Sequence, residues 1–560
     1  MSVVRAQPLN AAQAGRFRQA MQLLQSGARA QALGIAESLA AQAPGAADAW
    51  QLLGMCLGGN GRPSEALDAF DRALALAPGN RVVSRNYALF LAGYGRELRA
   101  RERLLAAEPV LRRAVELAPD LAFAWVDLGA VLRLLGRVDG ALEAYGKARQ
   151  ILRQRGEDPV DVSDAINGTL ADAGRAAEAL AGARDLADRY PGHAPAQETL
   201  ANLLWEHAPQ LAPGEDPLDG FRAAARAQPD NRPLQLALAR MLLSARRGEE
   251  ALSLLHPLRR RDPDDPLLRW FAADALDLLD RPEEAASLYA LAGRKLGALP
   301  EFLNAHARHA FRARRPDLAS QCARRVIEVD PRNQEGWSHL ATAWRLARDP
   351  REDWLCGYER LVGEVEVEPP PGFDGMAGFL QALAAQLELM HGAGREPVSQ
   401  SVRGGTQTAG QLFGRDDPTI QAAANALHRA AEGWLASLPV DPDHPFLGAP
   451  RRDVEFKGSW SVRLRSSGRH SNHIHPKGWL SSAFYVALPD CVGAGGDAHA
   501  GWIQFGQPLD ELGLDLSPRR VIQPRPGSLV LFPSYMWHGT VPFEGPQSRL
   551  TIAFDMQPKA

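Results

Sequence analysis

The sequence has little cysteine and no long hydrophobic run. Its four cysteines, Cys56, Cys322, Cys356 and Cys491, include no C-x-x-C pair, so neither a disulfide framework nor a structural zinc site is indicated. No apolar stretch approaches the ~18 residues of a membrane span, and residues 1–22 lack the apolar segment of a signal peptide. We therefore expect a cytoplasmic protein with no membrane partner.

The chain also lacks a strong charge of either sign. Lys and Arg number 63 against 66 Asp and Glu, a net charge of −3. This balance predicts no nucleic-acid partner, because it provides no overall basic surface for phosphates. With 45% hydrophobic residues the chain is not a disordered one, and at 560 residues it is long enough for several domains or a repeat array.

Prolines at regular spacing indicate a repeat. Pro44 and Pro78 are 34 residues apart, as are Pro229 and Pro263, and Pro331 follows 68 residues later, which is twice 34. A period of 34 residues is that of the tetratricopeptide repeat, whose unit is a pair of helices. The other intervals between helix-ending prolines are longer and need insertions.

Two copies of the repeat share six residues at the offsets 0, 3, 4, 16, 20 and 23. They are Trp50, Leu53, Gly54, Ala66, Phe70 and Ala73, and then Trp125, Leu128, Gly129, Ala141, Tyr145 and Ala148. A small residue such as Gly54 lets the two helices of a hairpin approach closely, while Trp50 and Phe70 fill the space to neighbouring hairpins. An unspecific Ala-rich helical bundle would not repeat these offsets.

Residues 10–350 thus resemble the tetratricopeptide repeat family. The resemblance implies an all-α, right-handed solenoid of about nine hairpins, some degenerate, whose concave face binds a protein or peptide partner. The acidic and proline-rich stretch 364–373 interrupts the helical pattern, since proline removes backbone donors and favours extended chain. We therefore expect a multidomain chain with the solenoid at 1–360, a linker at 361–373 and a further domain at 374–560.

The hydrophobic period changes in the further domain. Two helices are expected at 375–391 and 418–438. Short segments rich in Val, Ile, Phe, Tyr and Leu follow, separated by Gly and Pro, and they predict strands at 456–465, 481–488, 501–505, 528–532 and 548–556. Many short strands punctuated in this way are typical of an all-β sandwich or barrel.

Five of the 14 histidines lie between residues 470 and 538. In extended backbone His473 and His475 point to the same side, since side chains alternate with period two. His538 follows the hydrophobic strand at 528–532 and supplies a third imidazole. We expect these three to form a metal site, and His470 and His499 to be surface or hydrogen-bonding groups.

A basic side chain lies on the strand that follows. Arg549 comes 11 residues after His538, and Thr551 shares its face of the strand. A guanidinium binds a carboxylate bidentately, so this pair suits a carboxylate ligand. Trp460, Arg463 and Trp537 either line the same pocket or belong to the core.

Residues 375–560 resemble the iron(II)- and 2-oxoglutarate-dependent dioxygenases, specifically the group found fused to tetratricopeptide arrays. The motifs that carry the resemblance are His-Ile-His-Pro at 473–476, Leu-Phe-Pro-Ser-Tyr-Met-Trp-His-Gly-Thr-Val-Pro at 531–542, and the segment 400–408. The family's fold is a double-stranded β-helix, or jelly roll, with iron held by H-x-D/E…H. The resemblance implies His473 and His538 as ligands of Fe(II), and Arg549 with Thr551 as the site of the distal carboxylate of 2-oxoglutarate. It also suggests Tyr485 as a hydrogen-bonding group for that co-substrate.

His475 departs from the superfamily pattern, because it stands where most members have Asp or Glu. Imidazole suits Fe(II), so a site of three histidines is chemically reasonable, although it loses one anionic charge. Alternatively His475 is no ligand, and two imidazoles with chelating 2-oxoglutarate hold the iron.

The function implied by this resemblance is an oxidoreductase that uses O2 and 2-oxoglutarate to hydroxylate a protein or peptide side chain. A solenoid fused to the oxygenase would raise the local concentration of a polypeptide substrate. Two alternatives remain open. The first is a catalytically inactive scaffold, suggested by His475, and the second is a three-histidine iron dioxygenase that does not use 2-oxoglutarate.

Overall fold

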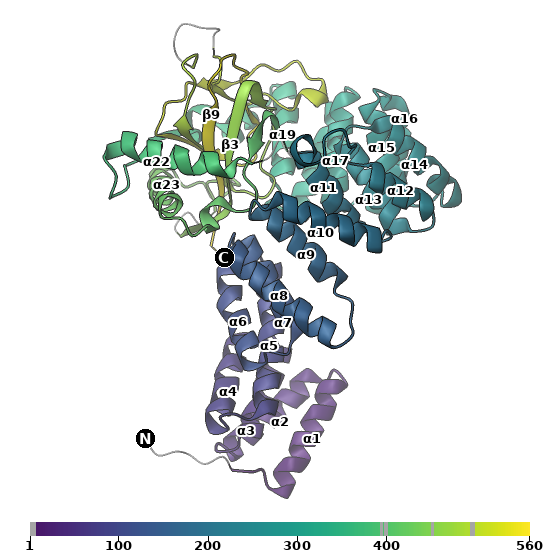
Figure 1. Ribbon diagram of the computed structural model, residues 1–560, viewed down its shortest axis with the longest axis vertical. Coiled ribbons are helices and arrows are strands. Elements are labelled where there is room, and N and C mark those ends of the chain that lie inside the picture. Colours follow the sequence, from purple (N-terminus) through teal and green to yellow (C-terminus); the bar gives the residue numbers. More distant parts are fainter. Residues whose placement is uncertain (1–6, 393–395, 397–400, 450–452, 493–498, 560) are drawn as a thin grey trace. The chain divides into compact units, whose positions relative to one another are not determined.

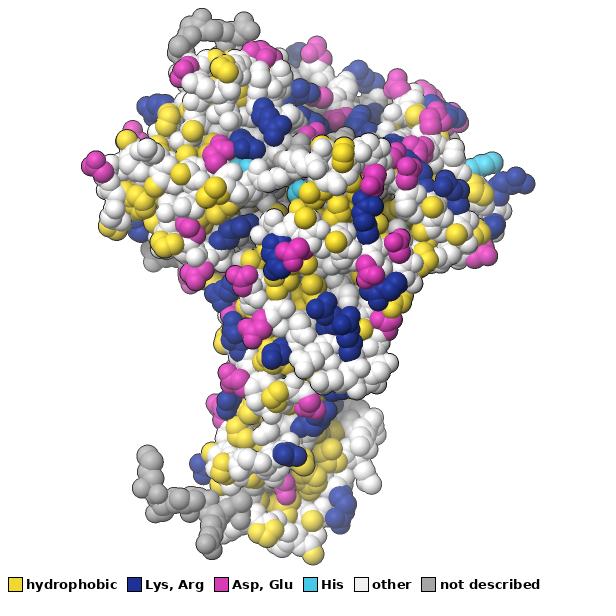
Figure 2. All heavy atoms as spheres, viewed as in Figure 1, with side chains coloured by type: hydrophobic (Ala, Val, Ile, Leu, Met, Phe, Trp, Pro, Cys, Tyr) yellow, Lys and Arg dark blue, Asp and Glu magenta, His cyan; other side chains and the backbone are white. Residues whose placement is uncertain are grey.

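The computed structural model describes residues 7–392, 396, 401–449, 453–492 and 499–559. The chain divides into two compact units, residues 1–169 and 170–560, and each is described by itself below (Figure 1). Among the described residues, no helix combines the length and the apolar character that a membrane crossing requires. Basic and acidic side chains are intermixed over the face drawn in Figure 2.

The first unit is all-helical. Its helices are α1 (Ala11–Gln25), α2 (Arg29–Gln42), α3 (Ala47–Gly59), α4 (Pro63–Leu76), α5 (Arg81–Ala100), α6 (Leu104–Leu117), α7 (Ala122–Leu134) and α8 (Val138–Gln154), and α9 (Val160–Asp172) runs across its end. The small residues at the repeat offsets act as predicted. A Cβ atom on Gly54 would lie 2.7 Å from the Phe70 ring, and one on Gly129 would lie 2.8 Å from the Tyr145 ring. The absence of a side chain therefore sets the spacing of each hairpin.

This packing gives a testable stability prediction. Gly129→Ala should lower the free energy of unfolding of the first unit by about 1–3 kcal/mol, because the added methyl group overpacks the hairpin. Gly146→Ala is the matched control, since Gly146 lies in α8 with no atom within 4 Å of an added Cβ. That change should stabilise by about 0.5–1 kcal/mol through helix propensity. Urea unfolding followed by circular dichroism measures both, and equal stability of the two variants would contradict the packing.

The second unit begins with the rest of the helical array. Its helices are α10 (Ala176–Arg189), α11 (Ala194–Leu211), α12 (Asp219–Ala227), α13 (Arg232–Ser244), α14 (Gly248–Arg261), α15 (Pro266–Leu278), α16 (Pro282–Leu296), α17 (Pro300–Arg312), α18 (Pro316–Val329) and α19 (Gln334–Ala347). The short helices α20 (Arg351–Cys356) and α21 (Tyr358–Leu361) follow. Among the described residues, α1–α18 are 18 helices, the number that nine hairpins would contain.

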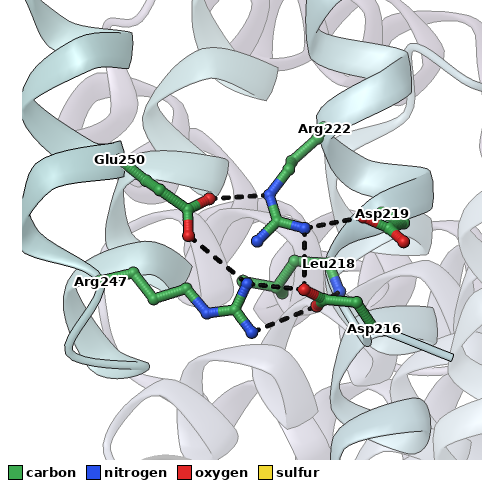
Figure 3. A network of polar contacts seen from close by, with 6 residues as sticks. All are labelled: Asp216, Leu218, Asp219, Arg222, Arg247 and Glu250. Atoms are coloured by element: carbon green, nitrogen blue, oxygen red, sulfur yellow. Dashed lines mark hydrogen bonds and ion pairs between the residues drawn. The ribbon is translucent and has the colours of Figure 1, made fainter. Parts of the chain in front are cut away.

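A polar network holds the insertion between α11 and α12, where the repeat spacing is long. Arg247 and Arg222 bind the carboxylate of Asp216 at 2.8 and 3.1 Å, and Glu250 accepts from Arg222 at 2.9 Å (Figure 3). Although burial raises the pKa of Asp216, hydrogen bonds from Arg247, the Leu218 backbone N–H and Arg222 bring it down to about 2. The carboxylate is therefore charged and fastens the inserted loop to α14.

Two antiparallel sheets make up the C-terminal part of the second unit, as expected for a jelly roll. The strands are β1 (Gly363–Glu366), β2 (Val402–Gln407), β3 (Val454–His470), β4 (Leu480–Ala487), β5 (Ile503–Phe505), β6 (Arg520–Ile522), β7 (Ser528–Pro533), β8 (His538–Thr540) and β9 (Arg549–Pro558). The large sheet has the order β1-β7-β4-β9-β3-β2, and the small sheet has the order β6-β5-β8. Helices α22 (Gly375–Met390) and α23 (Pro418–Ser437) pack on the large sheet (Figure 1), while two 3₁₀ turns, Leu412–Gly414 and Asp510–Leu512, lie in loops.

The expected linker at 361–373 needs correction. Its residues 363–366 form β1, an edge strand that pairs with β7 throughout, from Gly363 opposite Leu531 to Glu366 opposite Ser528. The prolines that suggested a linker follow the strand and end it, as proline does at a sheet edge. The sequence also missed the short strands β2, β6 and β8.

Candidate metal centre

Three histidines from two backbone segments converge. His473 and His538 form an antiparallel bridge between the segment after β3 and the start of β8, with N–H···O distances of 2.9 and 3.0 Å. Their ring centroids are 4.2 Å apart, and the His475 ring lies 4.9 Å from that of His538. Residues directly opposite in such a bridge present their side chains to the same side, so the two segments deliver all three imidazoles to one point.

Hydrogen bonds fix the tautomer of each ring. Nδ1–H of His473 donates to the Ser471 carbonyl at 2.8 Å, and Nδ1–H of His538 donates to the Met536 carbonyl at 3.0 Å. His475 directs its Nδ1–H to the Asp555 carboxylate at 2.5 Å. Because these acceptors cannot donate, each ring in its neutral form carries its lone pair on Nε2.

One ring nitrogen from each of the three histidines faces the others. Nε2 of His473 and Nε2 of His475 are 3.2 Å apart, and one ring nitrogen from each of the three residues lies within 4.8 Å of the others. With both protons on Nδ1, the 3.2 Å contact pairs two lone pairs and is repulsive rather than a hydrogen bond. A cation placed between the nitrogens would turn this repulsion into coordination, and neutral imidazole suits Fe(II) and other transition metals. The residues present therefore fit a metal ion.

Burial favours the neutral form of His473 and His538. Desolvation, together with the charge that His475 would carry, lowers the pKa of His473 to about 3. Burial, with smaller contributions from His473 and His475, holds the pKa of His538 well below its usual value. Neutral imidazole is the form that binds metals.

The site contains a carboxylate behind His475 that the sequence did not reveal. Asp555 accepts the Nδ1–H of His475 and also the Ser481 hydroxyl at 2.7 Å, and Ser481 is in turn 2.7 Å from Ser534 Oγ. A carboxylate that accepts from a ligating histidine orients the ring and makes it a stronger donor. If His475 binds a metal ion, Asp555 would supply behind its ring the negative charge that a ligating carboxylate supplies directly.

This arrangement predicts that Asp555→Asn weakens metal binding about 10- to 100-fold, the usual effect of losing an outer hydrogen-bonding partner. Co(II) titration of the metal-stripped full-length protein, followed by absorbance, measures the affinity. The control is Asp490→Asn, because the Asp490 carboxylate accepts from Gln547 at the surface of the same domain. Wild-type affinity in Asp555→Asn would show that the carboxylate does not support the site.

A buried basic side chain, Arg549, lies on the same strand face as Asp555. Residues 549, 551 and 555 alternate along β9 and so share one side of the sheet. The Arg549 guanidinium lies over the Tyr485 ring, 5.1 Å from its centre, and Tyr485 is directly opposite Thr551 in the β4–β9 register. Arg549 is only 2% exposed, and its Nε atom has no hydrogen-bond partner among the described residues.

An unpaired buried guanidinium is costly, because its charge is removed from water without a counter-ion. Burial accordingly lowers the pKa of Arg549. Burial raises the pKa of the neighbouring Tyr485 hydroxyl to about 12, although the positive charge of Arg549 lowers it. A buried guanidinium and a hydroxyl side by side are donors that suit a carboxylate.

The remaining candidates have other positions. His470 stacks on His473 with centroids 5.4 Å apart and lies 3.0 Å from Ser401 Oγ, outside the ligand cluster. His499 packs on Trp502. Trp460 borders the site, since its ring is 5.3 Å from that of His475, whereas Arg463 pairs with Glu388 at 2.6 Å.

Models of known families match both the helical region and the double-sheet region of the chain. The family model described as "Putative 2OG-Fe(II) oxygenase" matches residues 458–555. Tetratricopeptide repeat models match residues 47–80, 95–158 and 236–297. The N-terminal region therefore carries tetratricopeptide repeats, and the C-terminal region carries an oxygenase domain of this description.

Several solved structures are similar to part of the chain. A tetratricopeptide repeat protein from Parabacteroides merdae is 15% identical, with 46% of this chain and 98% of that chain covered and a TM-score of 0.33. Pseudomonas aeruginosa pilF is 21% identical over 40% of this chain and 95% of its own, with a TM-score of 0.27. MamA from Desulfovibrio magneticus RS-1 is 18% identical over 32% of this chain and 96% of its own, with a TM-score of 0.26. No curated protein matches the chain.

Proposed function

We propose that the protein is an Fe(II)- and 2-oxoglutarate-dependent dioxygenase that hydroxylates a protein or peptide side chain recruited by the helical array. The observation that carries the proposal is the convergence of three Nε2 lone pairs, from His473, His475 and His538, each fixed by a hydrogen bond at Nδ1. The oxygenase family match over residues 458–555 supports the same chemistry.

Each polar group of the site has a role in this proposal. The three imidazoles hold Fe(II), which when bound activates O2 for oxidation of the substrate. Arg549 binds the distal carboxylate of 2-oxoglutarate, assisted by Thr551 and the Tyr485 hydroxyl. The overall reaction converts a substrate C–H, O2 and 2-oxoglutarate into a C–OH, succinate and CO2, which balances in atoms and electrons.

The surroundings of the ligands exclude water and limit their motion. The Phe532 ring lies 4.5 Å from that of His538, and Trp460 packs on His475. In such an apolar setting the attraction between the guanidinium and a carboxylate is stronger than in water. The same setting keeps a reactive oxidant away from bulk solvent.

The substrate class rests on the array. Tetratricopeptide repeats generally mediate protein–protein interaction, and such repeats are present. In the first unit, Val82 and Leu89 on α5 and Phe123 on α7 expose 62%, 43% and 40% of their surface. Exposed apolar side chains on successive hairpins are a suitable contact for a polypeptide.

Succinate formation tests the proposal. Full-length protein supplied with Fe(II), O2 and 2-oxoglutarate should release succinate slowly without substrate and faster with a true substrate. A different result would be that iron binds, no succinate forms, and Arg549→Ala oxidises a substrate as well as the wild type does. That result would favour a three-histidine dioxygenase that does not use 2-oxoglutarate. If the folded protein binds no iron, the inactive scaffold replaces it.

A further inference from the structure

Two residues that are sequence neighbours of the metal-binding histidines, Ile474 and Trp537, pack against the helical array. Because side chains alternate in extended chain, Ile474 points away from the side of His473 and His475, and Trp537 points away from that of His538. Both enter one apolar cluster with the last helices of the array. Its other members are Ala307, Ala310, Phe311, Leu318, Ala319, Cys322, Ala343, Leu346, Leu509, Leu512 and Leu514. The helices α17–α19 thus form the back wall of the three-histidine site.

A buried hydrogen bond fixes the register of this contact. The Trp537 indole Nε1–H donates to Thr342 Oγ1 of α19 at 2.9 Å, and both residues are under 8% exposed. Thr342 in turn donates to the Ser338 carbonyl one turn earlier in its own helix at 2.9 Å. Trp537 immediately precedes His538, so α19 holds the backbone from which this ligand projects.

Main-chain contacts extend the connection. Arg345 of α19 donates to the Gly506 carbonyl at 2.6 Å, and the Gly506 N–H donates to the Trp537 carbonyl at 2.8 Å. Arg345 also binds the Ser517 carbonyl, and Arg312 of α17 binds the Glu511 carbonyl at 2.7 Å. The loop 506–519 of the double-sheet domain is therefore fastened to α17 and α19 at several points.

We propose that α17–α19 position the metal centre, with Thr342 as a positioning residue, so that metal binding and the conformation of the array's end are coupled. The inference rests on the metal site proposed above. Coupling between two sites is reciprocal. A metal ion should order α17–α19. If metal binding changes the affinity of these helices for a polypeptide by some factor, the bound polypeptide should change the metal affinity by the same factor.

The first test is Thr342→Val, which keeps the side-chain shape and removes the hydroxyl. Co(II) affinity of the full-length protein should fall about tenfold, as for loss of other outer partners of a metal site. Thr169→Val is the matched control, since Thr169 is also buried and donates to the carbonyl one turn earlier, that of Ala165, at 2.7 Å. Its affinity should equal that of the wild type.

The second test needs no variant. Hydrogen exchange of the metal-stripped wild-type protein should slow severalfold in α17 and α19 when Co(II) is added, and remain unchanged in α10. Unchanged exchange in α17 and α19, or wild-type affinity in Thr342→Val, would overturn the coupling while leaving the proposed function intact. Failure of the wild type to bind Co(II) at all would overturn both, so the two failures are distinguishable.

Discussion

Replacement of His538 by alanine is expected to lower Co(II) or Fe(II) affinity by well over a hundredfold, beyond the effect of losing any outer partner. The change removes one of three converging Nε2 atoms and leaves His473 and His475 as a two-ligand site. The fold should persist, because His538 joins His473 through backbone N–H and C=O groups that alanine retains. Metal titration of the stripped full-length protein measures the loss, and circular dichroism verifies the fold.

His499→Ala is the control for this prediction. His499 lies in the same histidine-rich stretch but packs on Trp502, outside the three-histidine cluster. Its removal should leave metal affinity unchanged. If His538→Ala bound metal as tightly as the wild type, the metal would have to lie elsewhere, and the assignment of the site would be wrong.

Arg549→Met is expected to weaken 2-oxoglutarate binding about a hundredfold or more, since losing one partner of a buried charge pair costs about 2–5 kcal/mol. The same change should leave the ligand-free protein as stable as the wild type or more so, because Arg549 is buried and the described residues supply no carboxylate partner for it. Calorimetric titration with 2-oxoglutarate, in the presence of a redox-inert metal, and thermal unfolding measure the two effects.

Arg463→Met provides the comparison. Arg463 lies on β3, beside β9, but already pairs with Glu388 at 2.6 Å, so its loss should not affect 2-oxoglutarate binding. When a protein keeps a residue for binding at a cost to stability, replacing that residue should raise the stability and weaken the binding. Loss of stability in Arg549→Met with unchanged 2-oxoglutarate affinity would show that Arg549 is a structural residue.

The parts of the molecule that depend on local sequence could be predicted. The repeat offsets of Gly54 and Phe70 reflect contact within one hairpin, and the structure places the two residues against each other. His473 and His475 share a side because of strand alternation over three residues. The main strands and both helices of the oxygenase domain were likewise anticipated to within a few residues.

The features that were missed depend on contacts between distant segments. Asp555 is 80 residues from His475, and only the pairing of β4 with β9 brings them together. A signal was present, since residues 549, 551 and 555 share one face of the strand, and this face carries the site. Thr342 and Trp537 are 195 residues apart, and no periodicity in either segment predicts their contact.

The edge strand β1 was missed for a different reason. Its two glutamates flank a valine, and this alternation is typical of a short exposed edge strand. We nevertheless predicted a linker because prolines follow the strand. The large sheet supplies the partner strand from 160 or more residues later in the chain. Pairing of this range is beyond a local sequence pattern.

The central claim is that one site holds both Fe(II) and 2-oxoglutarate, and an anaerobic titration tests it most directly. Metal-stripped full-length protein is titrated with Fe(II) and then 2-oxoglutarate while the visible charge-transfer band of the iron chelate is followed. A band in the wild type, absent in His538→Ala and weakened in Arg549→Met, is the predicted result. Folded wild-type protein that shows no band at saturating Fe(II) and 2-oxoglutarate would contradict the claim.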